Sequence, residues 1–231
     1  KNDLAETETV DKLFCMFDEH LENKGLISHK GTIVDATFVD APRQRNSRDE
    51  NKKIKNGVIP EGWEKPENKS KLAQKDIDAD WTKKNGERHF GYKDHVKCDA
   101  DSKLITNYSV TSASVHDSQR CLVFIGQEDE VLYADSAYSG KPIALALPEN
   151  CKNQICEKGY RNSPLTSEQK MNNRRKSRIR CRIEQIFGFM TGAMHGITIR
   201  SIGITRAWMN IGITNLVYNF CRYSYLKRAS A

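Results

Sequence analysis

Residues 32–39 read TIVDATFV, a run of β-branched and aromatic side chains that contains one acidic residue, Asp35. Such side chains favour a β-strand, and alternate residues of a strand point to opposite faces, so Asp35 shares a face with Ile33 and Val39. A carboxylate inside an apolar run is costly to bury unless it has a partner. We therefore predict a strand here and a polar or cationic partner for Asp35.

Two further carboxylates lie in comparable apolar surroundings. Asp135 ends the strand-like run VLYAD at 131–135, and Glu184 lies in the helical pattern IRCRIEQIF at 179–187. Divalent cations such as Mg²⁺ prefer oxygen ligands, and two such ions can clamp the attacking and leaving oxygens of a phosphodiester. With Asp35 as the shared ligand, the three residues predict metal-dependent phosphoryl transfer on DNA.

Each carboxylate also has an ordinary structural explanation when it is considered alone. Asp35 could cap a backbone group or pair with a buried arginine, and Asp135 could begin the turn after its strand. Glu184 could pair with Arg180 one helical turn earlier on a solvated face. Because exposed or paired carboxylates are the norm in proteins, the metal-site hypothesis depends on all three side chains meeting.

The hydrophobic pattern of the whole chain predicts a mixed α/β fold. An antiparallel hairpin followed by strands that alternate with helices indicates a mixed sheet covered by helices. Asp135, at the carboxyl end of a strand, occupies the place where open α/β sheets build their sites. Helices are expected at 8–24, 116–125, 166–192 and 204–226, and strands at 32–39, 90–98, 104–111, 131–135 and 145–148.

A basic cluster precedes and surrounds Glu184 in the sequence. Residues 170–182 contain seven Lys or Arg and no acidic residue. A helix with this charge suits phosphate contacts beside a metal site, and a solvated cationic face is the alternative of equal weight. The candidate DNA-binding residues are Arg174, Arg175, Lys176, Arg178, Arg180 and Arg182.

Composition restricts the class of protein further. The net charge of +7 over 231 residues suits a polyanionic partner. The seven cysteines include no Cys-x-x-Cys pair, which indicates reduced thiols in a cytoplasmic protein and not a disulfide framework or zinc site. No signal peptide or membrane-spanning run is visible. Residue 1 is not Met, so we expect further chain upstream.

Six stretches, in the same order, resemble the DDE transposases of bacterial insertion sequences, in the insertion sequence 5 branch of the insertion sequence 4 superfamily. Six ordered matches are far more specific than any single motif, and the resemblance covers about residues 13–226. The stretches are IVDAT at 33–37, DADW leading to FGYKDH at 78–95, VHDS at 115–118, YADSAYSG at 133–140, RCRIEQIF at 180–187 and YNFCR at 218–222.

The resemblance implies an RNase H-like fold and a triad that binds divalent metal, usually Mg²⁺, for which Mn²⁺ can substitute. It implies cleavage and strand transfer on double-stranded DNA, both transposon ends and target, by a homo-oligomer in the bacterial cytoplasm beside the nucleoid. Arg180 matches the family's helix motif, whose Tyr and Lys positions hold Ser177 and Thr191 here. By position, the catalytic and metal-binding triad is Asp35, Asp135 and Glu184.

The expected domain organisation follows from the resemblance and from composition. Residues 1–30 are predicted to be an N-terminal helical segment, and residues 31–231 the DDE catalytic domain. Residues 41–88 lack apolar periodicity, so we expect a polar insertion outside the core, mobile without DNA and near the basic face of the Glu184 helix. Two alternatives to an active transposase are an RNase H-like nuclease that only hydrolyses DNA and an inactive DNA-binding remnant.

Overall fold

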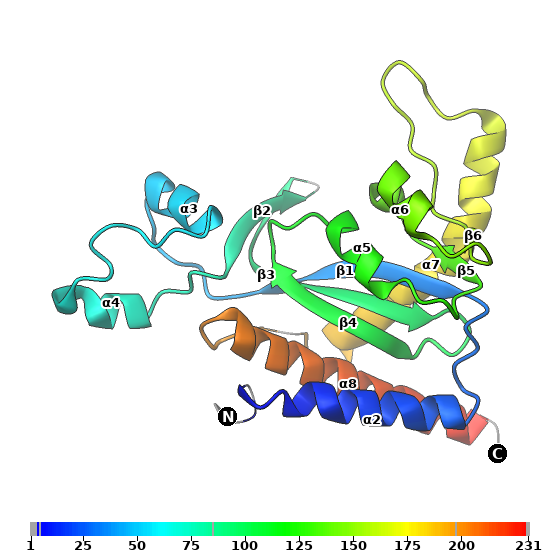
Figure 1. The fold of residues 1–231 in the computed structure, drawn as a ribbon, viewed down its shortest axis with the longest axis horizontal. Coiled ribbons are helices and arrows are strands. Elements are labelled where there is room, and N and C mark those ends of the chain that lie inside the picture. The colour runs from blue at the N-terminus through cyan, green and yellow to red at the C-terminus, as the bar shows by residue number, and fades with distance from the viewer. Residues whose placement is uncertain (1–3, 5, 85, 197, 230–231) are drawn as a thin grey trace.

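A mixed sheet forms the centre of the computed structural model, which describes residues 4, 6–84, 86–196 and 198–229 (Figure 1). The strand order is β2-β3-β1-β5-β6, with β4 also paired to β3. β1 is antiparallel to β3 and parallel to β5. The strands are β1 (Thr32–Asp40), β2 (Asp80–Lys84), β3 (Glu87–Asp99), β4 (Ile105–Ser112), β5 (Val131–Tyr133) and β6 (Lys152–Asn153).

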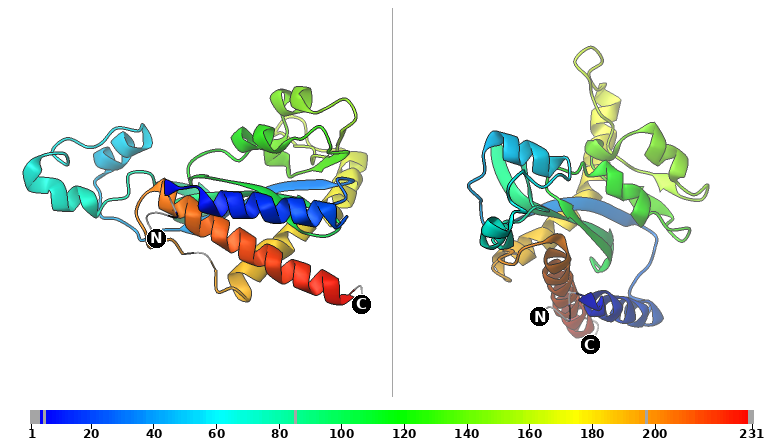
Figure 2. Two further views of the ribbon diagram at one scale, coloured as in Figure 1. Left: turned by 60° about the horizontal axis from the view of Figure 1, so that its bottom comes forward. Right: turned by 60° about the vertical axis from the view of Figure 1, so that its left-hand side comes forward.

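Helices cover both faces of this sheet (Figure 2). Ile33 and Val39 of β1 pack with three long helices, whereas Val34, on the opposite face of β1, packs with two short helices. This alternation is the period-2 pattern that the sequence shows. The long helices are α2 (Thr9–Asn23), α7 (Ser167–Gly192) and α8 (Ile204–Ala229), and the short ones are α5 (Ser118–Phe124) and α6 (Lys141–Ala146).

The predicted mixed sheet covered by helices is confirmed, and it is consistent with an RNase H-like fold. The four predicted helices correspond to α2, α5, α7 and α8, and a capping box fixes the start of α7, where Thr166 and Gln169 bond reciprocally. No helix in the described part of the chain is long and apolar enough to cross a membrane.

The strand predicted at 145–148 is wrong, because residues 141–146 form the helix α6. Pro142 stands in the first turn of α6, where proline is well tolerated, and the side chain of Leu145 is exposed. The apolar run LALP therefore contains the end of a short helix, with Leu147 as its C-cap, and not a strand at the sheet edge. The next strand along the chain is β6, two residues that pair in parallel with β5.

Residues 41–88 contain more regular structure than their lack of apolar periodicity indicates. They contain α3 (Arg48–Lys55), the short 3₁₀ helix η1 (Pro66–Asn68), α4 (Lys69–Ala73), all of β2, and the start of β3. Trp63 is 2% exposed and donates from Nε1 to Glu50 Oε1 at 2.9 Å. The buried Trp63 thus ties its loop to Glu50 of α3, a contact that periodicity could not predict.

For α3 and α4, the expected position near the basic face of the Glu184 helix is wrong. Figures 1 and 2 show α3 and α4 at the opposite end of the molecule from the N-terminal half of α7.

Gly91 lies on β3 just after the insertion returns to the sheet, where it pairs with Asp40 of β1. Its φ is +147°, and a Cβ at this position would lie 2.3 Å from Val39 O. Only glycine allows β3 to approach the end of β1 this closely.

Asp94 of β3 is fully buried against α8. Its Oδ1 accepts a hydrogen bond of 3.2 Å from Asn215 Nδ2. Within the described residues, Asp94 Oδ2 and Asn215 Oδ1 both lack a partner. Burial raises the pKa of Asp94 to about 8, although the Asn215 hydrogen bond opposes this shift. A protonated Asp94 has the donor that Asn215 Oδ1 needs.

We predict that Asp94→Asn makes stability less dependent on pH. Between the unfolded pKa of about 3.9 and the folded pKa of about 8, the folded protein binds more protons. Wild-type stability therefore falls as pH rises through this window, and the asparagine variant should be more stable at pH 8, on the order of 2 kcal/mol. Urea denaturation from pH 5 to pH 8 measures the effect.

Asp49→Asn, on the exposed first turn of α3, is the control and should leave the pH slope unchanged. An Asp94→Asn protein that keeps the wild-type slope would show that Asp94 is ionised in the folded state.

Candidate active site

Asp35 and Asp135 extend from neighbouring parallel strands. The register between β1 and β5 pairs Ile33 with Tyr133, so the two aspartates follow at the same distance along the two chains. β5 ends at Tyr133, and the next bridge on that edge of β1 joins Asp40 to Thr198. The edge of the sheet is thus open beside Asp35.

The carboxylate of Asp35 is largely withdrawn from solvent, with its side chain 14% exposed. Its Oδ1 accepts from the backbone N–H of Ala36 at 2.8 Å, and its Oδ2 accepts from Arg180 at 2.9 Å. The pKa of Asp35 is raised to about 6, mainly by burial and in part by the negative charge of Asp135, while the Ala36 N–H, Arg180 and Lys84 oppose the shift. A hydrogen-bonded cation therefore offsets part of the cost of burying this carboxylate.

Arg180 of α7 is that cation. Its guanidinium donates from one nitrogen to Asp35 and from the other to Glu184, which lies one helical turn later. Burial alone would lower the pKa of Arg180, but Glu184, Asp35 and Asp135 together raise it. All three predicted carboxylates thus act on one guanidinium, and Glu184 lies on the same side of the sheet as Asp35.

Core packing of α7 fixes this arrangement. Ile183, Ile186 and Met190 are buried in the main hydrophobic core. The side chain of Arg180 is 19% exposed and that of Glu184 is 56% exposed, so they lie at the rim of this packed face. Asp135 is held separately, because its Oδ1 accepts from the backbone N–H of Ala137 at 2.7 Å and caps η2 (Ser136–Tyr138).

The donor set fits a hard divalent cation. Desolvated carboxylates of like charge are stabilised by a nearby cation, and Asp35 and Asp135 supply oxygen ligands of the kind that Mg²⁺ prefers. The three carboxylates do not form a group with all ligand atoms within 4.8 Å of one another in the described residues, since Arg180 lies between Asp35 and Glu184. Arg180 already supplies part of the compensating charge.

A different group of possible metal ligands is His29, Glu128 and Asp129. Their ligand atoms all lie within 4.8 Å of one another in the described part of the chain. Lys97 already fills this group, because its Nζ lies 2.9 Å from Asp129 Oδ2 and 3.6 Å from Glu128 Oε1. Asp129 also accepts a hydrogen bond of 2.6 Å from Thr32. The Lys97 ammonium therefore already occupies this group and compensates one of its two carboxylate charges.

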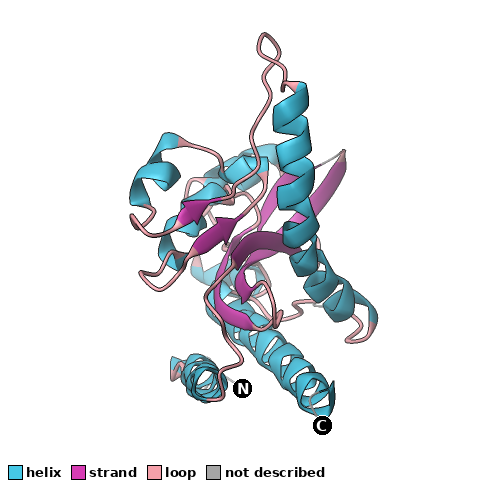
Figure 3. Ribbon diagram, turned by 90° about the vertical axis from the view of Figure 1, so that its right-hand side faces the viewer, coloured by secondary structure: helices cyan, strands magenta, loops and turns pink. Residues whose placement is uncertain are grey.

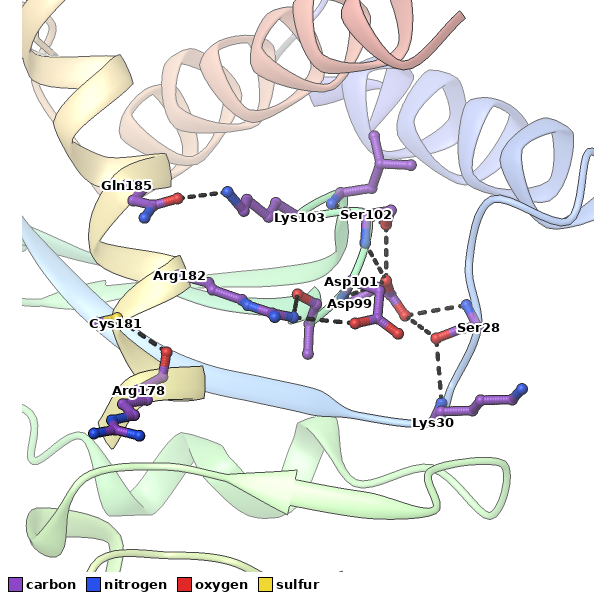
Figure 4. A network of polar contacts seen from close by, with 12 residues as sticks. Ser28, Lys30, Asp99, Asp101, Ser102, Lys103, Arg178, Cys181, Arg182 and Gln185 are labelled. Carbon is purple, nitrogen blue, oxygen red and sulfur yellow. Dashed lines mark hydrogen bonds and ion pairs between the residues drawn. The ribbon is translucent and has the colours of Figure 1, made fainter. Parts of the chain in front are cut away.

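The six predicted DNA-binding residues of α7 divide by their contacts. Figure 4 shows Arg182 reaching the turn after β3, where its guanidinium donates to Ala100 O at 2.6 Å and lies 3.0 Å from Asp101. Lys176 donates to Ile155 O at 2.9 Å. With Arg180 in the carboxylate cluster, the exposed residues without a protein partner in the described part are Arg174, Arg175 and Arg178.

These free arginines lie in the half of α7 that extends beyond the sheet (Figure 3). Arg174 and Arg178, four residues apart, line one shallow groove together with Lys170, Ser177 and Cys181. Residues four apart share a helix face. This half of α7 presents its charge to solvent, whereas Arg182 anchors the helix.

Two groups near the site were not predicted from the sequence. The carboxylate of Asp117, at the start of α5, accepts from Lys93 Nζ at 2.7 Å and does not cap the helix. Tyr138 is 1% exposed, and its hydroxyl has no hydrogen-bond partner in the described residues. Burial and the charges of Asp35, Asp117 and Asp135 raise the pKa of Tyr138 well above its usual range. The motif YADSAYSG contains Tyr138, but nothing in it showed that the hydroxyl is buried.

We predict that Arg182→Ala mainly lowers the stability of the fold and that Arg178→Ala mainly weakens DNA binding. Arg182→Ala should destabilise the fold by about 1–2 kcal/mol, because it removes the bonds to Ala100 and Asp101. Arg178→Ala should change stability by less than about 0.5 kcal/mol but weaken DNA binding and lower its salt slope by about 1. Urea denaturation and a salt series of DNA binding measure both. Equal effects of the two substitutions on DNA binding would contradict this division.

Residues 27–220 match the model of the transposase DDE domain. The chain is 30% identical over 197 residues, 81% of its length, to the transposase for insertion sequence element IS1106 of Neisseria meningitidis serogroup B. It spans 64% of the length of that curated relative. No solved structure matches. The matched region contains both strands and the helix that carry the three carboxylates, and the chain belongs to the transposase DDE domain family.

Proposed function

We propose that this chain is the catalytic part of a transposase that cuts and joins DNA at the ends of an insertion sequence. One observation supports this most: Asp35 and Glu184 both accept hydrogen bonds from the Arg180 guanidinium at the open edge of β1, and the charge of Asp135 acts on the same guanidinium. The relative with 30% identity is named a transposase. Within the family, we place the chain in the insertion sequence 5 branch of the insertion sequence 4 superfamily.

In this proposal Asp35, Asp135 and Glu184 hold divalent metal, with Mg²⁺ as the natural ion and Mn²⁺ as a substitute. The metal supplies electrostatic stabilisation of the attacking and leaving oxygens of the phosphodiester. Family membership supports a divalent metal, and the hard oxygen donors support Mg²⁺. Arg180 restrains Asp35 and Glu184 in the absence of metal, so it limits the repulsion between these carboxylates.

The basic residues of α7 orient the DNA backbone in this proposal. Arg174, Arg175 and Arg178 are exposed and contact phosphates, whereas Lys176, Arg180 and Arg182 act mainly by holding α7 and its carboxylate in place. Phosphate contacts set register and contribute little sequence selection. The partner is double-stranded DNA, bound by a homo-oligomer beside the nucleoid in the bacterial cytoplasm.

One observation favours the alternatives of a purely hydrolytic nuclease or an inactive remnant. Ser177 and Thr191 replace the Tyr and Lys of the family's helix motif. Thr191 Oγ1 donates to Phe187 O at 2.9 Å, within its own helix, and Ser177 Oγ lies 3.7 Å from Cys156 Sγ. Neither short side chain can reach as far as the residue it replaces.

We predict that Asp35→Asn abolishes DNA cleavage in Mg²⁺ and preserves or strengthens DNA binding. The substitution removes a metal ligand and a negative charge near phosphate, so the cleavage rate should fall about 100-fold or more. Asp135→Asn and Glu184→Gln should behave similarly. A nicking assay on supercoiled DNA, with EDTA as the metal-free reference, measures the rate.

Glu168→Gln, on the exposed first turn of the same helix, is the matched control for Glu184→Gln and should cleave normally. Wild-type cleavage by the Asp35→Asn protein would show that Asp35 has no role in the reaction.

We further predict that the chain joins DNA strands as well as cutting them. A labelled duplex with a free 3′-hydroxyl end should become covalently attached to a target plasmid in Mg²⁺, and a 3′-deoxy end should not. Cleavage without any joined product would favour the nuclease, and absence of both reactions with intact DNA binding would favour the remnant.

A further inference from the structure

A second basic pocket lies between the insertion and the segment that follows α7. Its volume is about 530 Å³. The insertion supplies Arg43 and Gln44 from the chain just after β1, and Lys71 and Lys75 from α4 and its end. Arg200 approaches from the other wall. The candidate active site contributes none of its residues to this pocket.

The charge of this pocket is positive and only partly compensated. Its one acidic lining residue, Asp76, is 3% exposed and accepts from the Tyr92 hydroxyl and from the backbone N–H groups of Asp78 and Ala79. Lys71 lies 3.6 Å from Glu50. For Arg43 and Arg200, no carboxylate within salt-bridge distance is found in the described part of the chain.

Aromatic rings contact three of these cations, and Lys75 Nζ also donates to Asn46 Oδ1 at 2.6 Å and to Arg45 O at 3.1 Å. The Arg43 guanidinium lies 5.7 Å from the ring centre of Trp81. Lys71 and Lys75 lie 5.1 and 5.3 Å from the ring centre of the buried Trp63. Cation–π contacts orient a charge without neutralising it. Gln44 adds a polar group, since its Oε1 is buried and has no partner among the residues described.

The pocket and the carboxylate cluster lie along the same strand. Asp40 ends β1, and the Thr198 bridge and the 3.0 Å bond from Ile199 N to Asp40 O bring Arg200 to that end. Asp40 lies five positions after Asp35, which is about 17 Å along an extended strand. That length equals about five base pairs of B-form DNA.

We propose that this pocket binds the phosphodiester backbone of a DNA duplex, about half a helical turn from the phosphate at the carboxylate cluster. The ligand is identified by chemistry: planar guanidinium groups without carboxylate partners pair well with phosphate oxygens, and the lysines add point charges. The choice of DNA rests on the proposed function. A phosphate-binding role accounts for the presence of three cations of this polar insertion, Arg43, Lys71 and Lys75, in the lining of one pocket.

The test is DNA binding by the full 231-residue chain in EDTA, where no cleavage occurs. The probe is a labelled 30-base-pair duplex, measured by fluorescence anisotropy over a series of salt concentrations. Arg43→Ala with Arg200→Ala should weaken binding about tenfold or more and reduce the salt slope by about 1 to 2. Arg43→Lys with Arg200→Lys should keep the slope, because the charge remains.

The matched control is Arg48→Ala with Lys52→Ala, which removes two exposed cations from α3 in the same insertion. It should change affinity less than threefold. Equal losses in the two double variants would overturn the proposal, because they would show only a general effect of charge. Normal binding by the Arg43/Arg200 variant would overturn it too. If that variant fails to fold, Arg200→Gln alone, on an exposed residue, should still reduce the slope by about 1.

The outcome is separable from that of the proposed function. A chain that never cleaves DNA but shows the expected loss in the Arg43/Arg200 variant would refute the transposase and leave the pocket as a DNA site. A chain that cleaves DNA, with binding unaffected by the two substitutions, would refute only the pocket.

Discussion

Two aspartates held side by side at the end of a parallel strand pair need a cation, and the Arg180 guanidinium is the one that hydrogen-bonds Asp35. Burial already raises the pKa of Asp35, and Asp135 adds to that cost. Removing one partner of a buried charge pair typically costs about 3–5 kcal/mol, although the half-exposed Glu184 reduces its share here. Any packing of α7 that turned Arg180 away would leave Asp35 uncompensated.

The surrounding structure is arranged so that α7 cannot turn. Its apolar residues enter the core on the side toward β1, and Arg182 fastens it to Ala100 at the turn after β3. That turn is itself rigid, because Asp99 accepts hydrogen bonds from Ser28 and from Ser102 (Figure 4). Because β5 ends at Tyr133, the chain can turn there, and Asp135 becomes the N-cap of η2. Core packing and polar anchors thus act together on one geometry.

The sequence predicted most of the sheet and the long helices, because the spacing of apolar residues in a strand or helix directly reflects which side chains are buried. It also predicted the three carboxylates, of which Asp35 and Glu184 bind Arg180 while Asp135 influences it by charge; their catalytic role stays a prediction. It did not predict α6, where a short apolar run is compatible with helix or strand, as periodicity alone cannot separate them. It missed the insertion's helices because Trp63 and a capping box organise them, and not a repeated apolar face.

The basic charge of the chain is divided more finely than composition suggests. On α7, some cations hold the protein together and others face solvent, although all lie in one short run of sequence. Beyond the other end of β1, Arg43 and Arg200 are distant in sequence but line one pocket, because the Asp40–Thr198 bridge brings their two segments together. A count of lysines and arginines cannot separate these classes, since each depends on whether a carbonyl or carboxylate lies within reach. The free cations therefore flank the carboxylates on two sides, which is the distribution that a rod-shaped polyanion crossing Asp35 would require.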